Sequence, residues 1–514
     1  MFKRVTSPAT GARARVRAIP GLAYLLAFLP ALALFALTLA GAQGQHLLRR
    51  DENIMLAILD ALARGWRLED IFLVSISPGV VAVLQALGAA ADVVLAGRAA
   101  AMLCGAICLL LTAAIARRLY GPGPVPALAT ALLASSPLFL YEATIIRPNL
   151  PALALALAAL LALLGAEWRT TARAAGAVAA AGLLFGLAVQ VKALALALTP
   201  LLLFLLAGLL RRPGRRAALP PAVAALAAAF AGGAAASVVG LAAATGSGAT
   251  LGQILATHLS AGSAVSPLER LSYGVNTAGQ VLLAHTWLVI LFGAGLLSAL
   301  PPGGESRPQA ALLAVWCATV AGALVVAFPT WDHHYVLLLP ALAIGASALV
   351  ARAAGGLLKL DPEALGTTLA VLGFALAASG AVAAGALIQA ERPGRQEREL
   401  ARLVRERTPA DRPIWSDNLY FPLLTGRPID PVLVDLSIKR IISGQLREEE
   451  LFALMDARPP AAVLVYDGLF DAFPRLTACL DATTDQTPVS LGGQRAYWLG
   501  PGDAERVVAC GAGQ

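Results

Sequence analysis

The sequence IPGLAYLLAFLPALALFALTLAGA occupies residues 19–42 and is apolar apart from Tyr24 and Thr38. A helix of about 20 apolar residues is long enough to cross a hydrocarbon core about 30 Å thick. Residues 19–42 therefore predict a membrane-spanning helix. The charged stretch Arg49-Arg50-Asp51-Glu52 follows where this span ends, so its side chains are expected at the boundary between lipid and water.

The composition excludes a soluble globular protein. Of the 514 residues, 58% are hydrophobic and only 14% are charged, with a mean hydropathy of +0.74. Only lipid keeps so much apolar surface from water. The continuous Ala- and Leu-rich runs also differ from the alternating pattern of a transmembrane barrel. The net charge of +8 does not indicate nucleic-acid binding, because the basic residues cluster in short loops between alternate apolar runs.

Further apolar runs predict an all-α polytopic membrane protein with about 11 transmembrane helices in all. After the first span they lie at 98–117, 124–144, 150–166, 174–190, 192–210, 219–244, 279–300, 309–329, 333–351 and 365–390. The interrupted run 71–91 is interpreted as part of an outer loop or a re-entrant helix. Residues 245–279 are interpreted as a polar outer loop.

The distribution of basic residues predicts the orientation. The first 17 residues carry Lys3, Arg4, Arg13, Arg15 and Arg17, and the loops on the same side contain far more arginines than the short loops opposite. By the positive-inside rule the N-terminus is cytoplasmic, and an odd number of spans places the C-terminal part outside.

The sequence divides into two expected domains. Residues 1–390 form the transmembrane domain, and residues 391–514, where charges become frequent, form a soluble, periplasmic α/β domain. Within the second domain, 393–407 and 446–455 predict helices, whereas 413–416, 461–466 and 496–499 predict strands. This domain either binds the acceptor or serves only for protein interaction. Its side chains that we expect to be exposed, and so available to an acceptor, are Trp415, Asp417, Tyr420 and Arg440.

Five cysteines are present. Cys104, Cys108 and Cys317 lie in apolar runs, where the expected role is packing. Cys479 and Cys510 lie in the C-terminal part. If this part is outside the cytoplasm the two thiols can form a disulfide, and the sequence leaves paired and free thiols as open alternatives.

Residues 53–66 predict a short amphipathic helix. Ile54 and Ile58 lie on one side and Asp60 and Arg64 on the other, which is typical of a helix lying flat on a membrane surface. Asp51 would then be held between this helix and the first span. One interpretation is a catalytic carboxylate, and the alternative is a solvated loop charge.

Several cationic or polar groups are expected on the same side of the membrane as Asp51. Arg147 ends one span, Lys192 stands where two apolar runs meet without a loop, and His333-His334-Tyr335 precedes another span. Together they suit an anionic lipid phosphate. Taken singly, Arg147 and Lys192 could instead reach out to lipid headgroups, and the histidines could belong to an aromatic belt. Glu142 is either a second acidic group or the end of a span.

The chain resembles the GT-C class of polytopic glycosyltransferases, in particular the bacterial branch of aminoarabinose and galacturonosyl transferases and relatives of protein O-mannosyltransferases. The order and spacing of several motifs carry the resemblance: Asp51-Glu52 after the first span, Ser77-Pro78-Gly79, Arg117-Arg118-Leu119-Tyr120-Gly121, Arg147-Pro148-Asn149, Gly186 to Lys192, and His334-Tyr335 with Leu339-Pro340-Ala341. It covers roughly residues 20–350 and the outer C-terminal module.

This resemblance implies an inverting membrane glycosyltransferase of the bacterial inner membrane, acting in the cell envelope on substrates such as lipopolysaccharide. The implied donor is a sugar on a polyprenyl phosphate, and the acceptor is a lipid, a glycan or a protein. Asp51 would be the general base, with Glu52 beside it. The donor phosphate would be bound by Lys192, Arg147, His334 and Tyr335, and the acceptor by Glu142, Asn149 and Arg270.

The sequence departs from the family pattern at two places. Asn149 stands where many members carry an acid, and Asn53-Ile54 replaces an aromatic pair after Asp51-Glu52, so the way in which the acceptor is bound is expected to differ. Some members need a divalent metal, but no convincing set of ligands is present, and no cofactor is expected. The alternative function is a transporter or flippase of a lipid-linked sugar.

Overall fold

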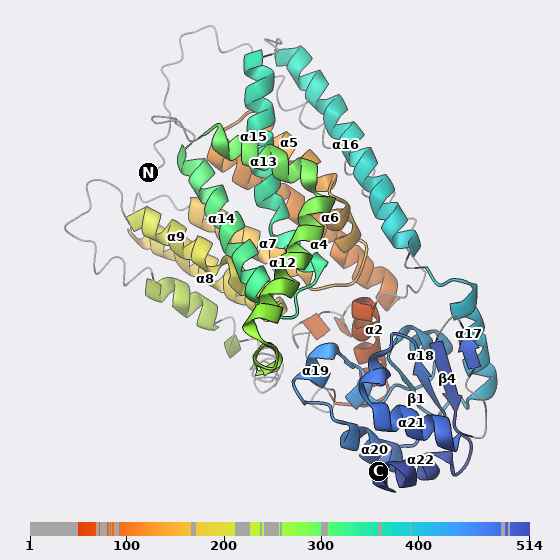
Figure 1. Cartoon of the computed structure of the whole chain (residues 1–514). Helices are drawn as coiled ribbons and strands as arrows, with labels where there is room; N and C mark the ends of the chain where they lie inside the picture. The colour runs from red at the N-terminus through yellow and green to blue at the C-terminus, as the bar shows by residue number, and fades with distance from the viewer. Residues whose placement is uncertain are drawn as a thin grey trace, which may run out of the picture. The chain divides into compact units, whose positions relative to one another are not determined.

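The computed structural model describes most of the chain from residue 50 onward (Figure 1). The described residues are 50–67, 71, 80–81, 83, 85–86, 92–165, 171–210, 227–236, 239–240, 256–257, 260–299, 307–357, 362–390, 392–484, 489–491 and 494–513. The first predicted span, residues 19–42, and most of the run 71–91 lie outside them.

The chain forms two compact units. Unit 1 combines residues 1–43, 98–244 and 268–387, and unit 2 combines residues 44–97, 245–267 and 388–514. The C-terminal residues are thus joined in unit 2 by the segment that follows the first predicted span. The helix that carries Asp51 and the C-terminal sheet belong to the same unit.

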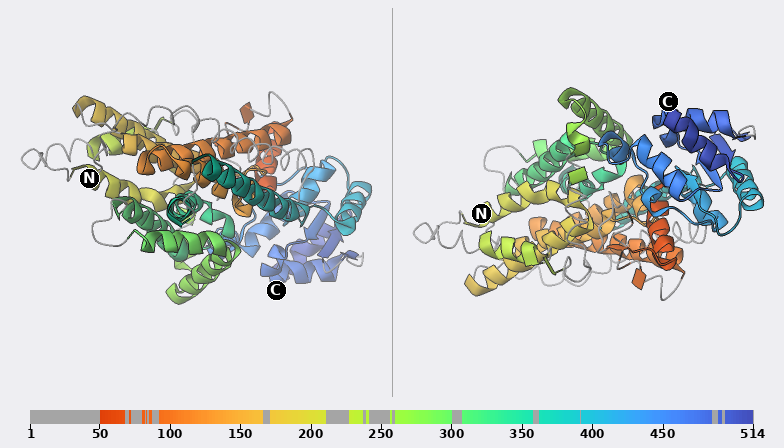
Figure 2. Two further views of the ribbon diagram at one scale, coloured as in Figure 1. Left: turned by 90° about the horizontal axis from the view of Figure 1, so that it is seen from above. Right: turned by 90° about the horizontal axis from the view of Figure 1, so that it is seen from below.

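Unit 1 is a helical bundle, seen in Figure 1 and from above and below in Figure 2. Its described helices include α4 (Val93–Tyr120), α5 (Pro124–Ala134), α6 (Pro137–Glu142), α7 (Asn149–Gly165), α8 (Thr171–Val191), η3 (Ala193–Leu198), α9 (Thr199–Leu210), α12 (Pro267–Ala284), α13 (Thr286–Leu297), α14 (Arg307–Val326), η5 (Asp332–Leu337), α15 (Leu339–Leu357) and α16 (Pro362–Ala390). The helix α15 packs between α5 and α13, and α7 packs along α8. Leu and Ala side chains fill one continuous core between them.

Two helices of unit 1 touch backbone to backbone. Gly182 on α8 faces the carbonyl of Phe230, and Gly233, on the apolar helix Ala227–Ala236, faces the carbonyl of Ala179. A Cβ atom on either glycine would overlap these carbonyl groups. Close approach of this kind is how helices associate in lipid, where packing replaces the hydrophobic effect.

Two described helices, α4 and α14, are each long and apolar enough to cross a membrane. A third span results if α12 and α13, which meet at an angle of 92°, are taken together. Several other predicted spans within the described residues correspond to shorter or broken apolar helices, such as α5 with α6, α7, and η5 with α15, whereas the run 365–390 lies within the 29-residue helix α16. The total of about 11 spans stays a prediction.

Unit 2 contains a four-stranded sheet with strands β1 (Ile414–Ser416), β2 (Ala462–Val465), β3 (Val489–Leu491) and β4 (Gln494–Trp498). The order is β1-β2-β4-β3, with β1 and β2 parallel and the other pairs antiparallel. Its helices are α2 (Arg50–Ala63), α17 (Arg395–Arg407), α18 (Tyr420–Thr425), η6 (Pro431–Leu433), α19 (Ile438–Ile442), α20 (Glu448–Ala457), η7 (Leu469–Ala472), α21 (Pro474–Thr483) and α22 (Asp503–Gly513). The three strands and two helices predicted here from sequence are present.

Both faces of the sheet are covered. Alternate residues of a strand point to opposite faces. Trp415, Val463 and Tyr497 therefore pack in one cluster, with residues of α20, α21 and α22. Ile414, Leu464 and others pack in a second cluster with residues of α17 and α18. The strand residues are buried on both sides, which explains why they form short apolar runs without an alternating pattern.

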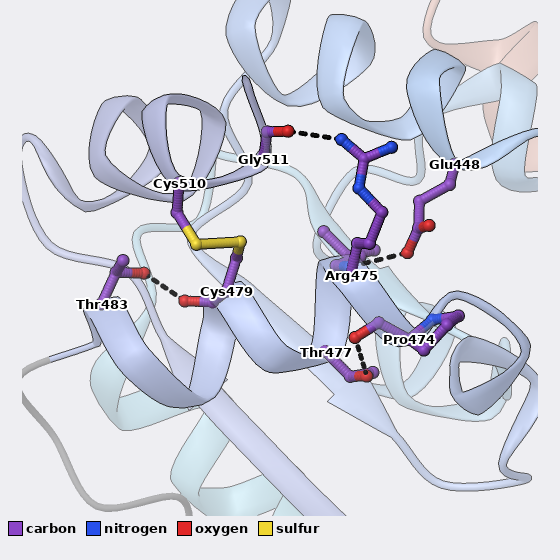
Figure 3. The surroundings of a disulfide bond; sticks show 9 residues. Glu448, Pro474, Arg475, Thr477, Cys479, Thr483, Cys510 and Gly511 are labelled. Carbon is purple, nitrogen blue, oxygen red and sulfur yellow. Dashed lines mark hydrogen bonds between the residues drawn. A yellow bond between two sulfur atoms is a disulfide. The ribbon is translucent and has the colours of Figure 1, made fainter. Parts of the chain in front are cut away.

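Cys479 of α21 and Cys510 of α22 form a disulfide with a Cα–Cα distance of 5.7 Å (Figure 3). The bond joins two helices on the same face of the sheet. Of the two alternatives that the sequence left open, the structure has the paired one. Cys104, Cys108 and Cys317 are free thiols in the helices of unit 1.

Candidate functional site

The two candidate catalytic carboxylates stand in the first turn of α2. Glu52 is completely buried and Asp51 is partly buried. Acidic groups are favourable in the first turn of a helix because they face the unsatisfied N–H groups and the positive end of the dipole. The alternative of a solvated loop charge is therefore wrong for Glu52, and both residues are helical.

The amphipathic pattern of α2 is confirmed, but the expectation that its apolar side contacts lipid was wrong. Ile54 and Ile58 are buried, whereas Asp60 and Arg64 form an ion pair of 2.8 Å on the outer side. The helix packs against α18 of the C-terminal module. The apolar side that we expected to rest on lipid is therefore covered by protein.

Four C-terminal residues that sequence reasoning expected to be exposed are buried. Trp415 and Tyr420 pack in the two clusters beside the sheet. Asp417 accepts hydrogen bonds from the backbone N–H groups of Tyr466, Asp467 and Leu469 at 2.7–3.0 Å, and so fixes the loop after β2. The expectation that these side chains are exposed to an acceptor was wrong, because they are buried inside unit 2. Arg440, the fourth, is 2% exposed.

In unit 1, Glu142, Arg147 and Asn149 bind one another. Nη1 of Arg147 donates to Oε1 of Glu142 at 2.5 Å, and Nδ2 of Asn149 donates to Oε2 of the same carboxylate at 2.7 Å. All three residues are buried, with exposures of 1%, 6% and 3%. The alternative that Arg147 extends to lipid headgroups is therefore wrong. Glu142 is an ion-pair partner at the end of α6, and the group closes the turn between α6 and α7.

Lys192 stands where two apolar helices meet without a loop, as predicted. The helix α8 ends at Val191, Lys192 has an extended backbone, and the 3₁₀ helix η3 begins at Ala193. Its side chain is partly buried. The turn η3 packs against α7 and α14.

His333, His334 and Tyr335 form the start of η5 and are all buried. The backbone N–H of Trp331 donates to Nδ1 of His334 at 3.2 Å, and the Tyr335 hydroxyl donates to the carbonyl of Gly274 at 3.4 Å. Because both imidazoles are buried, the interpretation as aromatic-belt residues is wrong for them. The turn η5 packs against α6, α7 and α14, so these side chains belong to the same end of unit 1 as Glu142 and Arg147.

Arg270 lies on a helix and not in a loop. Residues 245–279 were expected to be a polar outer loop, but residues 267–284 form α12. The prediction failed because Glu269 and Arg270 stand in the first turn of an amphipathic helix, where polar residues are common. Arg270 is partly buried.

The predicted site residues therefore form two groups. Arg147, Glu142, Asn149, Lys192, His334, Tyr335 and Arg270 belong to unit 1, and Asp51 and Glu52 belong to unit 2. Within unit 1, the turns that carry Lys192 and the histidines both contact α7 and α14. Among the residues that the structure describes, no group of three or more His, Cys, Asp or Glu side chains is placed to hold a metal ion.

Comparison with known proteins gives a family match over part of the chain. Residues 77–233 match the family of dolichyl-phosphate-mannose-protein mannosyltransferases. No curated protein matches the sequence.

Solved structures match over nearly the whole chain. ArnT from Cupriavidus metallidurans, crystallised with undecaprenyl phosphate, has a TM-score of 0.65 and 15% identity, with 93% of this chain and 98% of ArnT covered. Its apo structure gives a TM-score of 0.61 at 14% identity, covering 92% of this chain and 97% of ArnT. The archaeal oligosaccharyltransferase AglB from Archaeoglobus fulgidus, in complex with an inhibitory peptide and a dolichol phosphate, gives 0.53 at 15% identity, covering 87% of this chain and 69% of AglB.

Proposed function

We propose that this membrane protein, which has the fold of the GT-C class of glycosyltransferases, transfers a sugar from a polyprenyl phosphate to a lipid, glycan or protein acceptor. The observation that carries the proposal is the match with ArnT, which extends over almost all of both chains and includes both units. ArnT was crystallised with undecaprenyl phosphate, and the same class of carrier is proposed as donor here.

In the proposed reaction Asp51 is the general base. Its carboxylate takes the proton of the acceptor hydroxyl while the oxygen attacks the anomeric carbon of the donor. The bond between the anomeric carbon and the phosphate oxygen breaks, and the configuration at that carbon inverts. The polyprenyl phosphate leaves with the bonding electron pair. Asp51 is favoured over Glu52 because Glu52 is completely buried, whereas Asp51 keeps part of its surface exposed.

The cations of unit 1 are proposed to hold the departing phosphate. Lys192, which stands between α8 and η3, and Arg147, which pairs with Glu142, are the two candidates. A positive group beside the phosphate offsets the charge that develops as the bond breaks. His334 and Tyr335 are proposed to complete this phosphate site. Glu142, Asn149 and Arg270 are proposed to act at the acceptor, with Glu142 and Asn149 working as one hydrogen-bonded group.

The proposed location is the outer face of a bacterial inner membrane, with about 11 spans, a cytoplasmic N-terminus and unit 2 outside. The Cys479–Cys510 disulfide supports the outer location of the C-terminal part, because disulfides persist in oxidising compartments.

The test is loss of donor when the purified protein is incubated with a panel of polyprenyl-phosphate sugars and lipid acceptors. We expect the Asp51→Asn variant to lose at least about a hundredfold of the wild-type rate, since a general base contributes 10²–10⁴-fold. Asp60→Asn is the matched control: it makes the same change on the same helix, at a residue paired with Arg64 on the outer side. It is expected to keep the wild-type rate.

Wild-type turnover by Asp51→Asn would remove this residue from the mechanism. A wild-type protein that consumes no donor but moves a lipid-linked sugar across vesicles would instead establish the transporter alternative.

A further inference from the structure

A serine and a histidine from distant parts of the sequence meet inside unit 1. Nε2 of His285 lies 3.0 Å from the hydroxyl oxygen of Ser136, and the two residues are 149 positions apart in the sequence. Ser136 is completely buried, and His285 is 5% exposed. The proposed reaction uses neither side chain, so this buried polar pair calls for a role of its own.

The other ring nitrogen of His285 determines how the pair is bonded. Nδ1 lies 3.0 Å from the backbone carbonyl oxygen of Val281. Because a carbonyl oxygen can only accept, Nδ1 carries the proton of the neutral imidazole, and Nε2 remains as the acceptor. The hydroxyl of Ser136 therefore donates to Nε2. Both ring nitrogens have a partner, as a buried imidazole requires.

His285 stands at the corner between two helices. The helix α12 ends at Ala284, α13 follows directly, and the two helices meet at 92°. The backbone of His285 is bonded in both directions, because its N–H donates to the carbonyl of Val281 and its own carbonyl accepts the N–H of Leu288. The imidazole is therefore presented from a fixed point of the bundle.

The helix α12 is in turn fixed near its middle. The hydroxyl of Tyr335, in η5, donates to the carbonyl of Gly274 at 3.4 Å. The same glycine lies so close to the carbonyl of Val325, at the end of α14, that a Cβ atom would overlap it. The helix that ends at the corner is thus tied to η5 and α14.

Ser136 begins the short helix that ends with Glu142. It is the N-cap residue of α6, and its hydroxyl oxygen accepts the backbone N–H of Phe139 at 3.4 Å. The helix α6 has six residues, which is fewer than two turns. The position of its first turn therefore sets that of Glu142, whose carboxylate binds Arg147 and Asn149.

A serine that donates to a histidine is also the arrangement of an activated nucleophile. Ser136 is not placed for that role, because it is completely buried and its oxygen also caps α6. The pair therefore acts through the helices that it joins.

We propose that His285 is a positioning residue for Glu142: through its bond with Ser136 it fixes the first turn of α6 and so holds the Glu142 carboxylate in place for the acceptor. This inference rests on the proposed function, in which Glu142 acts at the acceptor, and deepens it. The helix α12 then connects the acceptor group, through His285, with the proposed phosphate residue Tyr335.

The first measurement needs no turnover. Thermal unfolding of the full chain in detergent is compared for the wild type, His285→Asn, Glu142→Gln and the double variant. Asparagine is too short to reach Ser136, yet it is a favourable N-cap residue for α13. We expect Glu142→Gln to lower the melting temperature less in the His285→Asn background than in the wild type, because α6 no longer holds the carboxylate in place. Additive effects would overturn the proposal.

Two further variants control this comparison. His285→Gln places an amide near the position of Nε2 and keeps an acceptor for Ser136, so Glu142→Gln should have its full effect in this background. Ser135→Ala removes a neighbouring buried hydroxyl that donates to the carbonyl of Leu132, three residues before it. The effects of Ser135→Ala and Glu142→Gln should add.

The second measurement separates positioning from a general loss of stability. The donor panel assay is run with the lipid acceptor that the wild type uses best, and KM is measured for donor and acceptor. For His285→Asn we expect KM for the acceptor to rise about tenfold, the effect of one lost buried hydrogen bond, while KM for the donor is unchanged. His285→Gln should restore the wild-type value. An unchanged KM for the acceptor, or an equal rise in both constants, would overturn the positioning role.

If His285→Asn does not fold, Ser136→Ala takes its place in both measurements, because it removes the hydroxyl and leaves the imidazole at the corner. The same outcomes then support or overturn the proposal. If the wild type consumes no donor, the proposed function fails, and the unfolding comparison still decides whether His285 positions Glu142.

Discussion

At the scale of single residues, the buried group of Glu142, Arg147 and Asn149 shows how unit 1 stabilises an ion pair away from water. Removing an ion pair from water costs several kcal/mol for each ion, and attraction returns this only when the geometry is good. Both oxygens of Glu142 are occupied, by Nη1 of Arg147 and Nδ2 of Asn149. The pair is therefore satisfied as a unit, and loss of one partner leaves a buried charge alone.

We expect Glu142→Gln to reduce the stability of the protein by about 3 to 5 kcal/mol, the range for breaking a buried pair. The amide keeps the size of the side chain but not the charge opposite Arg147. Thermal unfolding in detergent measures the loss. The matched control is Glu399→Gln, which breaks an exposed pair with Arg402 on α17 and should leave the melting temperature unchanged.

Equal melting temperatures for the Glu142→Gln variant and the wild type would show that Arg147 does not depend on this carboxylate for its stability.

At the scale of elements, glycines set the distance between α8 and the helix Ala227–Ala236. Gly182 has no room for a side chain because the carbonyl of Phe230 occupies the space. Gly176, on the same helix, has nothing within 4 Å of the position of a Cβ atom. The two glycines differ only in what lies opposite them, so they form a matched pair.

We expect Gly182→Ala to destabilise the protein by about 1 to 3 kcal/mol, as overpacking does. Gly176→Ala should be neutral or stabilise by up to about 1 kcal/mol, because alanine is the better helix former. Melting temperatures of the two variants provide the comparison. If both substitutions stabilise, the helices are not in contact at Gly182.

Sequence patterns predicted the elements of the chain better than its contacts. Long apolar runs gave α7 and α8 closely, and short apolar runs gave β1 and β2. The helix α12 was missed because its polar first turn resembles a loop. The ion pair of Glu142 with Arg147 could not be predicted either, since the two residues lie on either side of a break between helices and not on one helical face.

Contacts between distant segments were beyond sequence reasoning altogether. The helix α2 packs on α18, although most of the chain separates the two helices, and no pattern in the sequence pairs these segments. The motifs around Asp51 and Lys192 carried the resemblance to glycosyltransferases, but the positions of these residues relative to their partners depend on the fold.

At the scale of the whole molecule, the disulfide bears on the cellular compartment in which unit 2 is expected. Cys479 and Cys510 are separated by 31 residues, and closing a loop of this length stabilises a domain by about 3 to 4 kcal/mol in the chain-entropy model. The bond also joins α21 to α22 directly. An oxidising environment is required to form it.

We expect a maleimide carrying a polyethylene glycol chain to label Cys479 and Cys510 only after reduction of membranes isolated from cells. The assay uses a chain in which Cys104, Cys108 and Cys317 are replaced by alanine, so that only this pair can react. A gel shift measures the labelling. Labelling without reductant would place the C-terminal part in a reducing compartment and contradict the proposed orientation.

The closed turn between α6 and α7 also bears on how the protein is made. A lone arginine or glutamate costs several kcal/mol when the translocon releases a segment into the bilayer. Because Glu142 and Arg147 are only a few residues apart, they can neutralise each other as soon as the hairpin leaves the translocon, before any other helix arrives. We therefore expect the same two side chains to lower the cost of inserting this hairpin into the membrane.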